Sequence, residues 1–272
     1  MSQDTQPDWD NIAEKFDIWV PHLAPVGDAL LSCLDAEAGE SVLDVASGTG
    51  EPALTLARRL NGVTIFGTDA ASGMVAVAQR KAEYEALRNI TFYCMPAERL
   101  EFDDDRFDRV MSRFGAMLFE EPVKGLKEMY RVLKPGGRFA IAVWGAPELM
   151  TTLSWAAQVF KDRVPEEFQP PIDIVARLGV PGALEQALTE AGYGVFEIEA
   201  RRLDYEFPNF EAYWQAVEDS EIMRQQLDVL QPEEQNEVRD EVALLAGECR
   251  TENGLVIPHE YLLAFGNKGA AC

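Results

Sequence analysis

A carboxylate followed four residues later by Gly-x-Gly is the feature of this sequence best suited to binding a cofactor. Asp44 stands inside the short apolar segment Ser41–Val45, which is typical of a buried strand, and Gly48 and Gly50 follow it. Glycine permits a tight turn and a close approach of the backbone to a ligand, because it has no Cβ. Pro52 then suits the first turn of a helix. The segment therefore predicts a strand, a ligand-binding turn and a helix.

Two kinds of cofactor are compatible with this turn. The run Gly48-x-Gly50-x-x-Ala53 satisfies the fingerprint of dinucleotide-binding turns. Such a turn does not need a carboxylate in the strand before it, whereas a cofactor with a free amino-acid end can use one. Asp44 could contact the ammonium of that cofactor directly or through water, or hold the loop by accepting backbone N–H groups. The carboxylate therefore favours a cofactor with an amino-acid end.

Strands and helices alternate after this turn. An apolar strand ending in Asp69 comes next, and amphipathic helices separate the strands that follow. This alternation is typical of a parallel sheet with helices on both faces, which binds ligands at the carboxyl ends of its strands. Further strands are expected at 63–69, 90–94, 107–114, 138–145, 196–207 and 261–268.

The chain after residue 208 departs from simple alternation, because a helical stretch precedes the last expected strand. We expect that stretch, residues 209–258, to form a cap over a substrate. Residues 1–40 are expected to form an N-terminal helical lid. Residues 41–208 and 259–272 then make up the cofactor-binding domain.

Composition narrows the class of partner. The 272 residues carry 47 acidic and 24 basic side chains, a net charge of −23, which repels phosphate backbones and anionic lipids. We therefore expect a small-molecule substrate, no nucleic acid and no membrane. The polar N-terminus and the lack of a long apolar run predict a cytoplasmic protein. The four cysteines are scattered and only two histidines are present, so no metal site is expected.

Four motifs, VLDVASGTG, GTD, PAERLEF and RVLKPGGRFAIAVWG, resemble those of class I S-adenosylmethionine (SAM) methyltransferases. They are most similar to the small-molecule group that includes the ubiquinone and menaquinone biosynthesis enzymes. The resemblance covers roughly Trp9 to Gly145, with a weaker match from Ala191 to Lys268. It implies a Rossmann-like, seven-stranded, mostly parallel sheet, SAM as cofactor, and methyl transfer to a small metabolite. The alternatives are a SAM-binding protein without transferase activity and an NAD-dependent oxidoreductase.

The resemblance also assigns roles to cofactor-binding residues. Asp69 would accept hydrogen bonds from both ribose hydroxyls, and Ala97 would offer its backbone N–H to adenine. Pro96 replaces an aspartate common in the family, so Glu98, a backbone carbonyl or water would accept from the adenine amine. The full implied set in the core of the domain is Asp44, Ser47, Gly48, Gly50, Asp69, Ala70, Met74, Pro96, Ala97, Glu98, Ser112 and Arg113.

The N-terminal segment could close over the cofactor. In enzymes of this group the segment before the first strand often folds across the cofactor. Here Ile12, Phe16 and Trp19 fall on one helical face, and Lys15 would be the cation for the cofactor carboxylate. The alternative is an amphipathic helix that is only scaffold.

Acceptor residues are less determined by the sequence. His22 is a candidate general base, with a surface or core histidine as the alternative. His259 follows a proline near the last strand and is expected to be structural or exposed. The residues expected to contact the substrate, or to form core instead, are Met117, Trp144, Tyr213 and Trp214.

Overall fold

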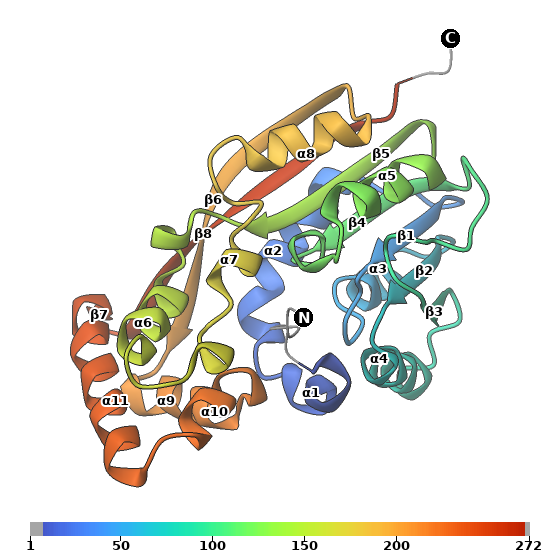
Figure 1. The fold of residues 1–272 in the computed structure, drawn as a ribbon. Coiled ribbons are helices and arrows are strands. Elements are labelled where there is room, and N and C mark those ends of the chain that lie inside the picture. Colours follow the sequence, from blue (N-terminus) through green and yellow to red (C-terminus); the bar gives the residue numbers. More distant parts are fainter. Residues whose placement is uncertain (1–7, 270–272) are drawn as a thin grey trace.

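One twisted sheet, parallel except at its reversed strand β8, organises the protein (Figure 1). The structure is a computed structural model that describes residues 8–269, with only the backbone described at 221–223; the expected lid and cofactor domain also include residues 1–7 and 270–272, which lie outside the described residues. The sheet order is β3-β2-β1-β4-β5-β8-β6, and the short β7 pairs with β8. The strands are β1 (Ser41–Val45), β2 (Thr64–Asp69), β3 (Ile90–Cys94), β4 (Phe107–Arg113), β5 (Leu133–Trp144), β6 (Val195–Phe207), β7 (Arg250–Thr251) and β8 (Gly254–Asn267).

β1 lies at the centre of the parallel part of the sheet. It pairs with β2 on one side and β4 on the other, and all five of its residues are buried. A strand buried on both faces is apolar throughout, which explains the run Val42, Leu43 and Val45. β8 runs antiparallel to both β5 and β6. The predicted Rossmann-like, mostly parallel fold is therefore confirmed.

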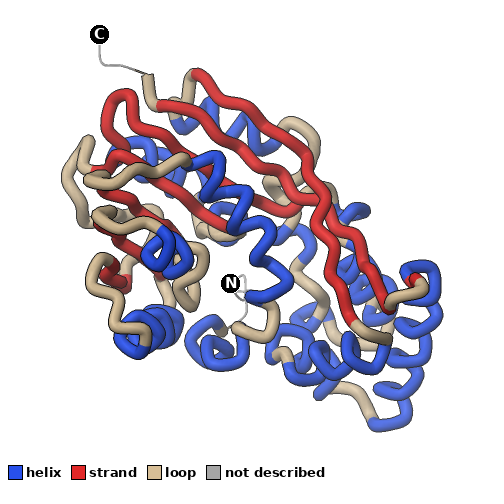
Figure 2. The backbone as a smooth tube through the Cα atoms, turned by 180° about the vertical axis from the view of Figure 1, so that it is seen from behind, coloured by secondary structure: helices blue, strands red, loops and turns tan. Residues whose placement is uncertain are grey.

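Helices cover both faces of the sheet. α2 crosses the face that Figure 2 presents, and α5 and α8 pack together on the opposite face (Figure 1). No helix of residues 8–269 is both long and apolar enough to span a bilayer. The helices are α1 (Trp9–Phe16), α2 (Val20–Leu34), α3 (Ala53–Arg59), α4 (Ser72–Tyr84), α5 (Pro122–Val132), α6 (Thr151–Phe160), α7 (Ile172–Val175), α8 (Ala183–Ala191), α9 (Phe210–Asp219), α10 (Glu221–Asp228) and α11 (Pro232–Leu245).

Two strands begin earlier than expected. β5 starts at Leu133 rather than at residue 138, because the Lys-Pro-Gly-Gly stretch bends within the strand; Gly136 takes a φ of +78° there, and its N–H donates to the Lys268 carbonyl. β8 starts at Gly254 rather than at 261, because it pairs with β6 from Leu255 onward. Residues 254–258 therefore belong to the sheet and not to the cap.

The cap is built from two insertions rather than one. α6, which lies between β5 and β6, packs against α11. α9, α10 and α11 come from the expected insertion after β6. Figure 1 shows α6 and α9–α11 together beyond one end of the sheet, where the long strands β6 and β8 reach them. The segment between β5 and β6 therefore packs with the helices of the stretch that the sequence analysis expected to form a cap.

The N-terminal helix α1 packs on α4 through a small apolar cluster of its own. Ile12 of α1 is buried there with Met74 of α4, apart from the main core. The Asp10 carboxylate accepts from the Gly73 N–H at 2.5 Å, and a Cβ at position 73 would lie 2.5 Å from the Asp10 carbonyl oxygen. Arg80 of α4 also pairs with Glu14. α1 therefore has a docking surface that is separate from the domain core.

We predict that Ile12→Ala releases α1 without unfolding the domain. Losing a buried isoleucine costs about 2–4 kcal/mol, and here that loss falls on the small cluster alone. Chymotrypsin should then cleave near Phe16 much faster, while the main thermal transition stays nearly unchanged. Leu30→Ala is the control, since Leu30 is fully buried in the main core and its loss should lower that transition. An equal drop in both variants would show that α1 is part of the core.

Candidate functional site

A cavity of about 400 Å³ lies where β1, β2 and β4 end, under α1. The glycine turn after β1, the segments after β2, β3 and β4, and the N-terminal helices form its wall. This is where a parallel α/β sheet is expected to bind a ligand. Its lining includes Trp9, Phe16, Ser47, Gly48, Thr49, Glu51, Asp69, Ala70, Met74, Pro96, Ala97, Glu98, Arg113 and Phe114.

The Asp69 carboxylate joins two of these segments. One oxygen accepts from the Gly48 N–H and the other from the Ala71 N–H, both at 2.9 Å. Burial raises the pKa of this carboxyl. Each carboxylate oxygen has a second lone pair, so Asp69 can still accept hydrogen bonds from a ligand in the cavity. Gly48 has a φ of +54°, and a Cβ there would meet no atom within 4 Å, so its missing side chain leaves open space in the cavity.

Asp44 lies beneath the glycine turn and is 1% exposed. Neither of its carboxylate oxygens has a close hydrogen-bond partner among the described residues, although the backbone N–H of Ala53 helps to lower its pKa. Burial raises the pKa of Asp44 to about 8, although the Arg113 guanidinium acts in the opposite direction. The hydroxyls of Ser47 and Ser112 are also buried without partners. Such groups are costly in a folded protein, and a ligand with an ammonium or ordered water would satisfy them.

Arg113, at the end of β4, brings a half-buried cation to the same region. Burial lowers its pKa, while Asp44 and Glu51 oppose that shift. Its Nη1 donates to the Leu23 carbonyl at 3.4 Å. A half-buried guanidinium beside carboxylate oxygens that lack close partners complements both ends of a zwitterion, which has one carboxylate and one ammonium.

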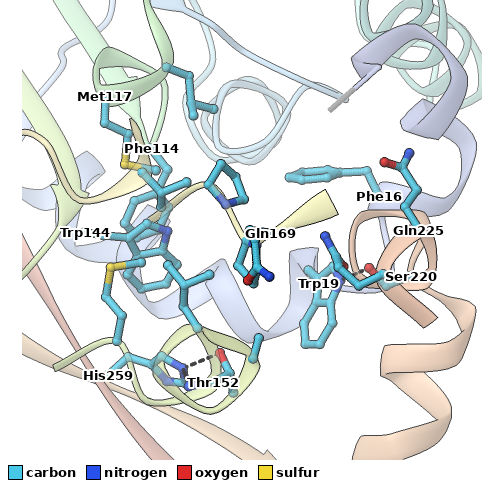
Figure 3. Close-up of a pocket in the computed structure, with 18 of the residues that line it drawn as sticks. Phe16, Trp19, Phe114, Met117, Trp144, Thr152, Gln169, Ser220, Gln225 and His259 are labelled. Carbon is cyan, nitrogen blue, oxygen red and sulfur yellow. Dashed lines mark hydrogen bonds between the residues drawn. The ribbon is translucent and has the colours of Figure 1, made fainter. Parts of the chain in front are cut away.

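A second cavity, also of about 400 Å³, lies between the sheet and the cap (Figure 3). Aromatic side chains dominate its wall, and the rings of Phe114 and Trp144 stack there with centroids 4.1 Å apart. Polar groups are few. The wall includes Trp9, Phe16, Trp19, Phe114, Met117, Trp144, Met150, Thr152, Glu167, Phe168, Gln169, Tyr205, Ser220, Gln225, Gln226 and His259.

The two cavities share part of their wall. The shared residues come from the N-terminal segment and from the segment that follows β4. They are Trp9, Phe16, Leu23, Phe114 and Leu118. A ligand in the polar cavity can therefore present one end to the aromatic cavity.

Polar contacts fix the N-terminal segment above both cavities. Asp17 accepts from the Thr49 hydroxyl of the glycine turn at 2.6 Å and pairs with Lys81 of α4 at 2.9 Å. The Trp19 indole N–H donates to the Ser220 hydroxyl at 2.9 Å, at the junction of α9 and α10. The segment therefore connects the glycine turn to the cap.

Most of the cofactor residues implied by sequence come together around the polar cavity. Asp44, Gly50 and Ser112 are buried and do not line it. Trp19 lines the aromatic cavity instead, with Met117 and Trp144. Lys15 lies on the exposed face of α1 and lines neither cavity. Among the described residues that line this cavity, the cation is Arg113, which is half-buried.

Three acceptor expectations do not match the structure. His22 lines neither cavity, because its ring packs on Phe207, with centroids 4.5 Å apart, and burial lowers its pKa. Tyr213 is 1% exposed inside the cap, in edge contact with Trp155. The Trp214 indole donates to Glu218 within α9. Tyr213 and Trp214 therefore form cap core, and His22 is not placed to act as a base.

The sequence did not identify several cavity residues. His259, expected to be structural or exposed, is 5% exposed and lines the aromatic cavity. Extending the last strand back to Gly254 would have revealed it, since residues 255, 257 and 259 then alternate onto the buried face. Thr152 and Gln169 come from the insertion after β5, where no pattern marks a ligand-facing residue.

Comparison with known proteins supports cofactor binding by the part of the chain that contains the polar cavity. Residues 42–137 match a family model described as a methyltransferase domain. The ubiquinone/menaquinone biosynthesis C-methyltransferase of Geobacter sulfurreducens is 42% identical over 119 residues, which cover 43% of this chain and 46% of that protein. The match thus spans less than half the length of this relative.

Solved structures share the fold over nearly the whole chain. A phosphoethanolamine N-methyltransferase of Haemonchus contortus, in complex with SAM, superposes with a TM-score of 0.61 at 18% identity, covering 96% of this chain and 57% of that chain. A [4+2]-cyclase superposes with a TM-score of 0.58 at 20% identity, covering 96% of each chain. The fold alone therefore does not determine the reaction.

We predict that Gly48→Ala weakens binding of S-adenosylhomocysteine, the product form of the cofactor that the sequence resemblance implies. The added methyl would enter the cavity, and crowding of this kind costs about 1–3 kcal/mol. Calorimetry measures the affinity. Gly182→Ala is the matched control, because Gly182 also has a positive φ and open space around it but lies outside both cavities. Equal affinities in the two variants would show that Gly48 does not face the ligand.

Proposed function

We propose that this chain, which carries a class I methyltransferase domain over residues 42–137, transfers a methyl group from SAM to a small aromatic metabolite. The observation that carries the proposal is the shared wall of the two cavities. One cavity has the polar groups that a nucleoside with an amino-acid end requires. The other is aromatic and can hold an acceptor next to it.

The polar cavity fits SAM in its chemistry. Asp69 can accept from the ribose hydroxyls while it holds the glycine turn. Arg113 in the cavity wall and Asp44, buried behind that wall, provide groups of opposite charge for the zwitterionic amino-acid end. Met74 and Ala97 line the cavity where the resemblance implies contacts with adenine.

When bound, SAM supplies an electrophilic methyl group on a positively charged sulfur. The chain's contribution is to hold an acceptor in line with that group and to exclude water. Phe114 lies in the shared wall, so its ring and the stacked Trp144 can place a flat acceptor beside the cofactor cavity. We infer that α1 acts as a lid, since Trp9 and Phe16 line both cavities.

The relative named as a ubiquinone/menaquinone biosynthesis C-methyltransferase suggests a quinone-type acceptor methylated on carbon. Its match extends over 43% of this chain. The aromatic cavity is compatible with such a ring, and its wall is mainly built from segments after residue 137.

The experiment that tests the proposal is turnover of SAM to S-adenosylhomocysteine, followed by mass spectrometry with a panel of aromatic metabolites. A methylated product supports the proposal. Tight SAM binding with no product from any acceptor favours a binding protein without transferase activity. Binding of NADH in place of SAM would favour an oxidoreductase.

We predict that Asp69→Ala lowers the affinity for S-adenosylhomocysteine by about 2–4 kcal/mol, because two hydrogen bonds to a charged acceptor are lost. A 2′,3′-dideoxy analogue separates this effect from loosening of the glycine turn. It should bind the wild type weakly and lose little more in the variant. If the variant loses equal affinity for both ligands, Asp69 acts only on the turn.

Cofactor binding should also release a proton from Asp44. With a pKa of about 8, this carboxyl is mostly protonated at pH 7, and a nearby ammonium would favour its charged form. Arg113 assists ionisation, whereas Glu51 and Asp69 oppose it. We expect release of roughly one proton at pH 7, and affinity that rises from pH 6 to pH 8.

Calorimetry in buffers of different ionisation enthalpy measures this proton. Methylthioadenosine, which lacks the amino-acid end, is the control ligand and should release none. Asp44→Asn should abolish the release with S-adenosylhomocysteine. Unchanged release in that variant would assign the proton to another group.

A further inference from the structure

Thr152 and His259 form a hydrogen-bonded polar pair in the wall of the aromatic cavity. Thr152 is the second residue of α6 and His259 belongs to β8, so the pair joins the insertion after β5 to the sheet. The Thr152 hydroxyl lies 2.9 Å from His259 Nε2 (Figure 3). The Tyr205 ring packs on the His259 imidazole, with centroids 4.2 Å apart.

Backbone partners determine which imidazole nitrogen carries the proton. The Thr152 backbone N–H can only donate, and it approaches His259 Nε2 at 3.3 Å, so Nε2 is the acceptor. The Ile257 carbonyl can only accept, and it lies 3.1 Å from Nδ1, so Nδ1 carries the hydrogen. Burial, which lowers the pKa of His259 to about 4, keeps the ring neutral. The Thr152 hydroxyl must therefore donate its hydrogen to Nε2.

This leaves Thr152 Oγ1 as an acceptor toward the cavity. Gln169 is constrained in the same way, because its side-chain nitrogen lies 2.9–3.0 Å from the carbonyls of Phe160, Lys161 and Val164. These carbonyls take both of its hydrogens and leave the side-chain oxygen as an acceptor. No lysine or arginine lines this cavity within residues 8–269, and its one acidic residue is Glu167. Ser220, Gln225 and Gln226 add a hydroxyl and two neutral amides. The wall beside Thr152 therefore offers oriented acceptors, and the cavity has no cation among the described residues.

We propose that Thr152, oriented by His259, recognises a hydroxyl of the methyl acceptor, and that the cavity selects uncharged hydroxylated aromatic molecules over anionic ones. The proposal rests on the proposed function, since it identifies the aromatic cavity as the acceptor site. An acceptor with a hydroxyl supplies the hydrogen that Thr152 Oγ1 lacks. A carboxylate or phosphate would be desolvated there without a cation to compensate.

Calorimetry with three naphthalene probes, in the absence of cofactor, tests the selectivity. We expect the wild type to bind 1-naphthol about five- to tenfold more tightly than 1-methoxynaphthalene, the effect of one net hydrogen bond. 1-Naphthoate should bind at least about tenfold more weakly than 1-naphthol. Thr152→Val should reduce the naphthol preference to near one.

Thr151→Val is the matched control, because Thr151 precedes Thr152 in the same helix and donates to the Pro258 carbonyl outside the cavity. It should keep the wild-type preference. His259→Phe tests whether His259 orients the Thr152 hydroxyl or only packs in the wall. In this variant the Thr152 hydroxyl no longer donates to Nε2 and can donate to the ether oxygen of 1-methoxynaphthalene. The affinity for 1-methoxynaphthalene should therefore rise relative to that for 1-naphthol.

The proposal is overturned if the wild type does not bind naphthol, if Thr152→Val keeps the preference, if Thr151→Val loses it equally, or if naphthoate binds as well as naphthol. A separate titration with S-adenosylhomocysteine tests the proposed function. Probe selectivity without cofactor binding would retain the recognition by Thr152 and reject methyl transfer. Cofactor binding and turnover without probe selectivity would retain methyl transfer and reject recognition by Thr152.

Discussion

The Asp69 carboxylate, which accepts backbone N–H groups from two different loops, is the interaction on which the site depends. It ties the glycine turn after β1 to the loop after β2, and so sets the shape of the cofactor cavity. A parallel sheet makes this possible, because neighbouring strands end at the same edge. The Thr49 hydroxyl of the same turn donates to Asp17, which places the N-terminal segment over that cavity.

The N-terminal segment contributes to the walls of both cavities, which are otherwise built from different parts of the chain. It reaches the cap through the buried hydrogen bond from Trp19 to Ser220 and reaches α4 through Asp17 and Lys81. Its small apolar cluster with α4 is separate from the main core. If α1 lost its packing on α4, both cavities would therefore open while the sheet stayed folded.

Sequence patterns located the residues around the polar cavity better than those around the aromatic cavity. Asp44, Gly48 and Asp69 are determined locally, because a turn after a buried strand needs particular residue types at fixed spacing. Tyr213 and His259 show why the rest was missed. An aromatic residue at helical spacing suits a cap core and a ligand wall equally, and only tertiary packing decides between them. His259 was hidden by a strand boundary placed seven residues too late.

A crystal structure with S-adenosylhomocysteine bound tests the central claim most directly. We expect the adenosine beside Asp69, the amino-acid end near Asp44 and Arg113, and the sulfur at the wall that both cavities share, facing Phe114. That position would put the transferable methyl group at the entrance to the aromatic cavity. A sulfur turned away from the shared wall, or a ligand bound outside the polar cavity, would contradict the account.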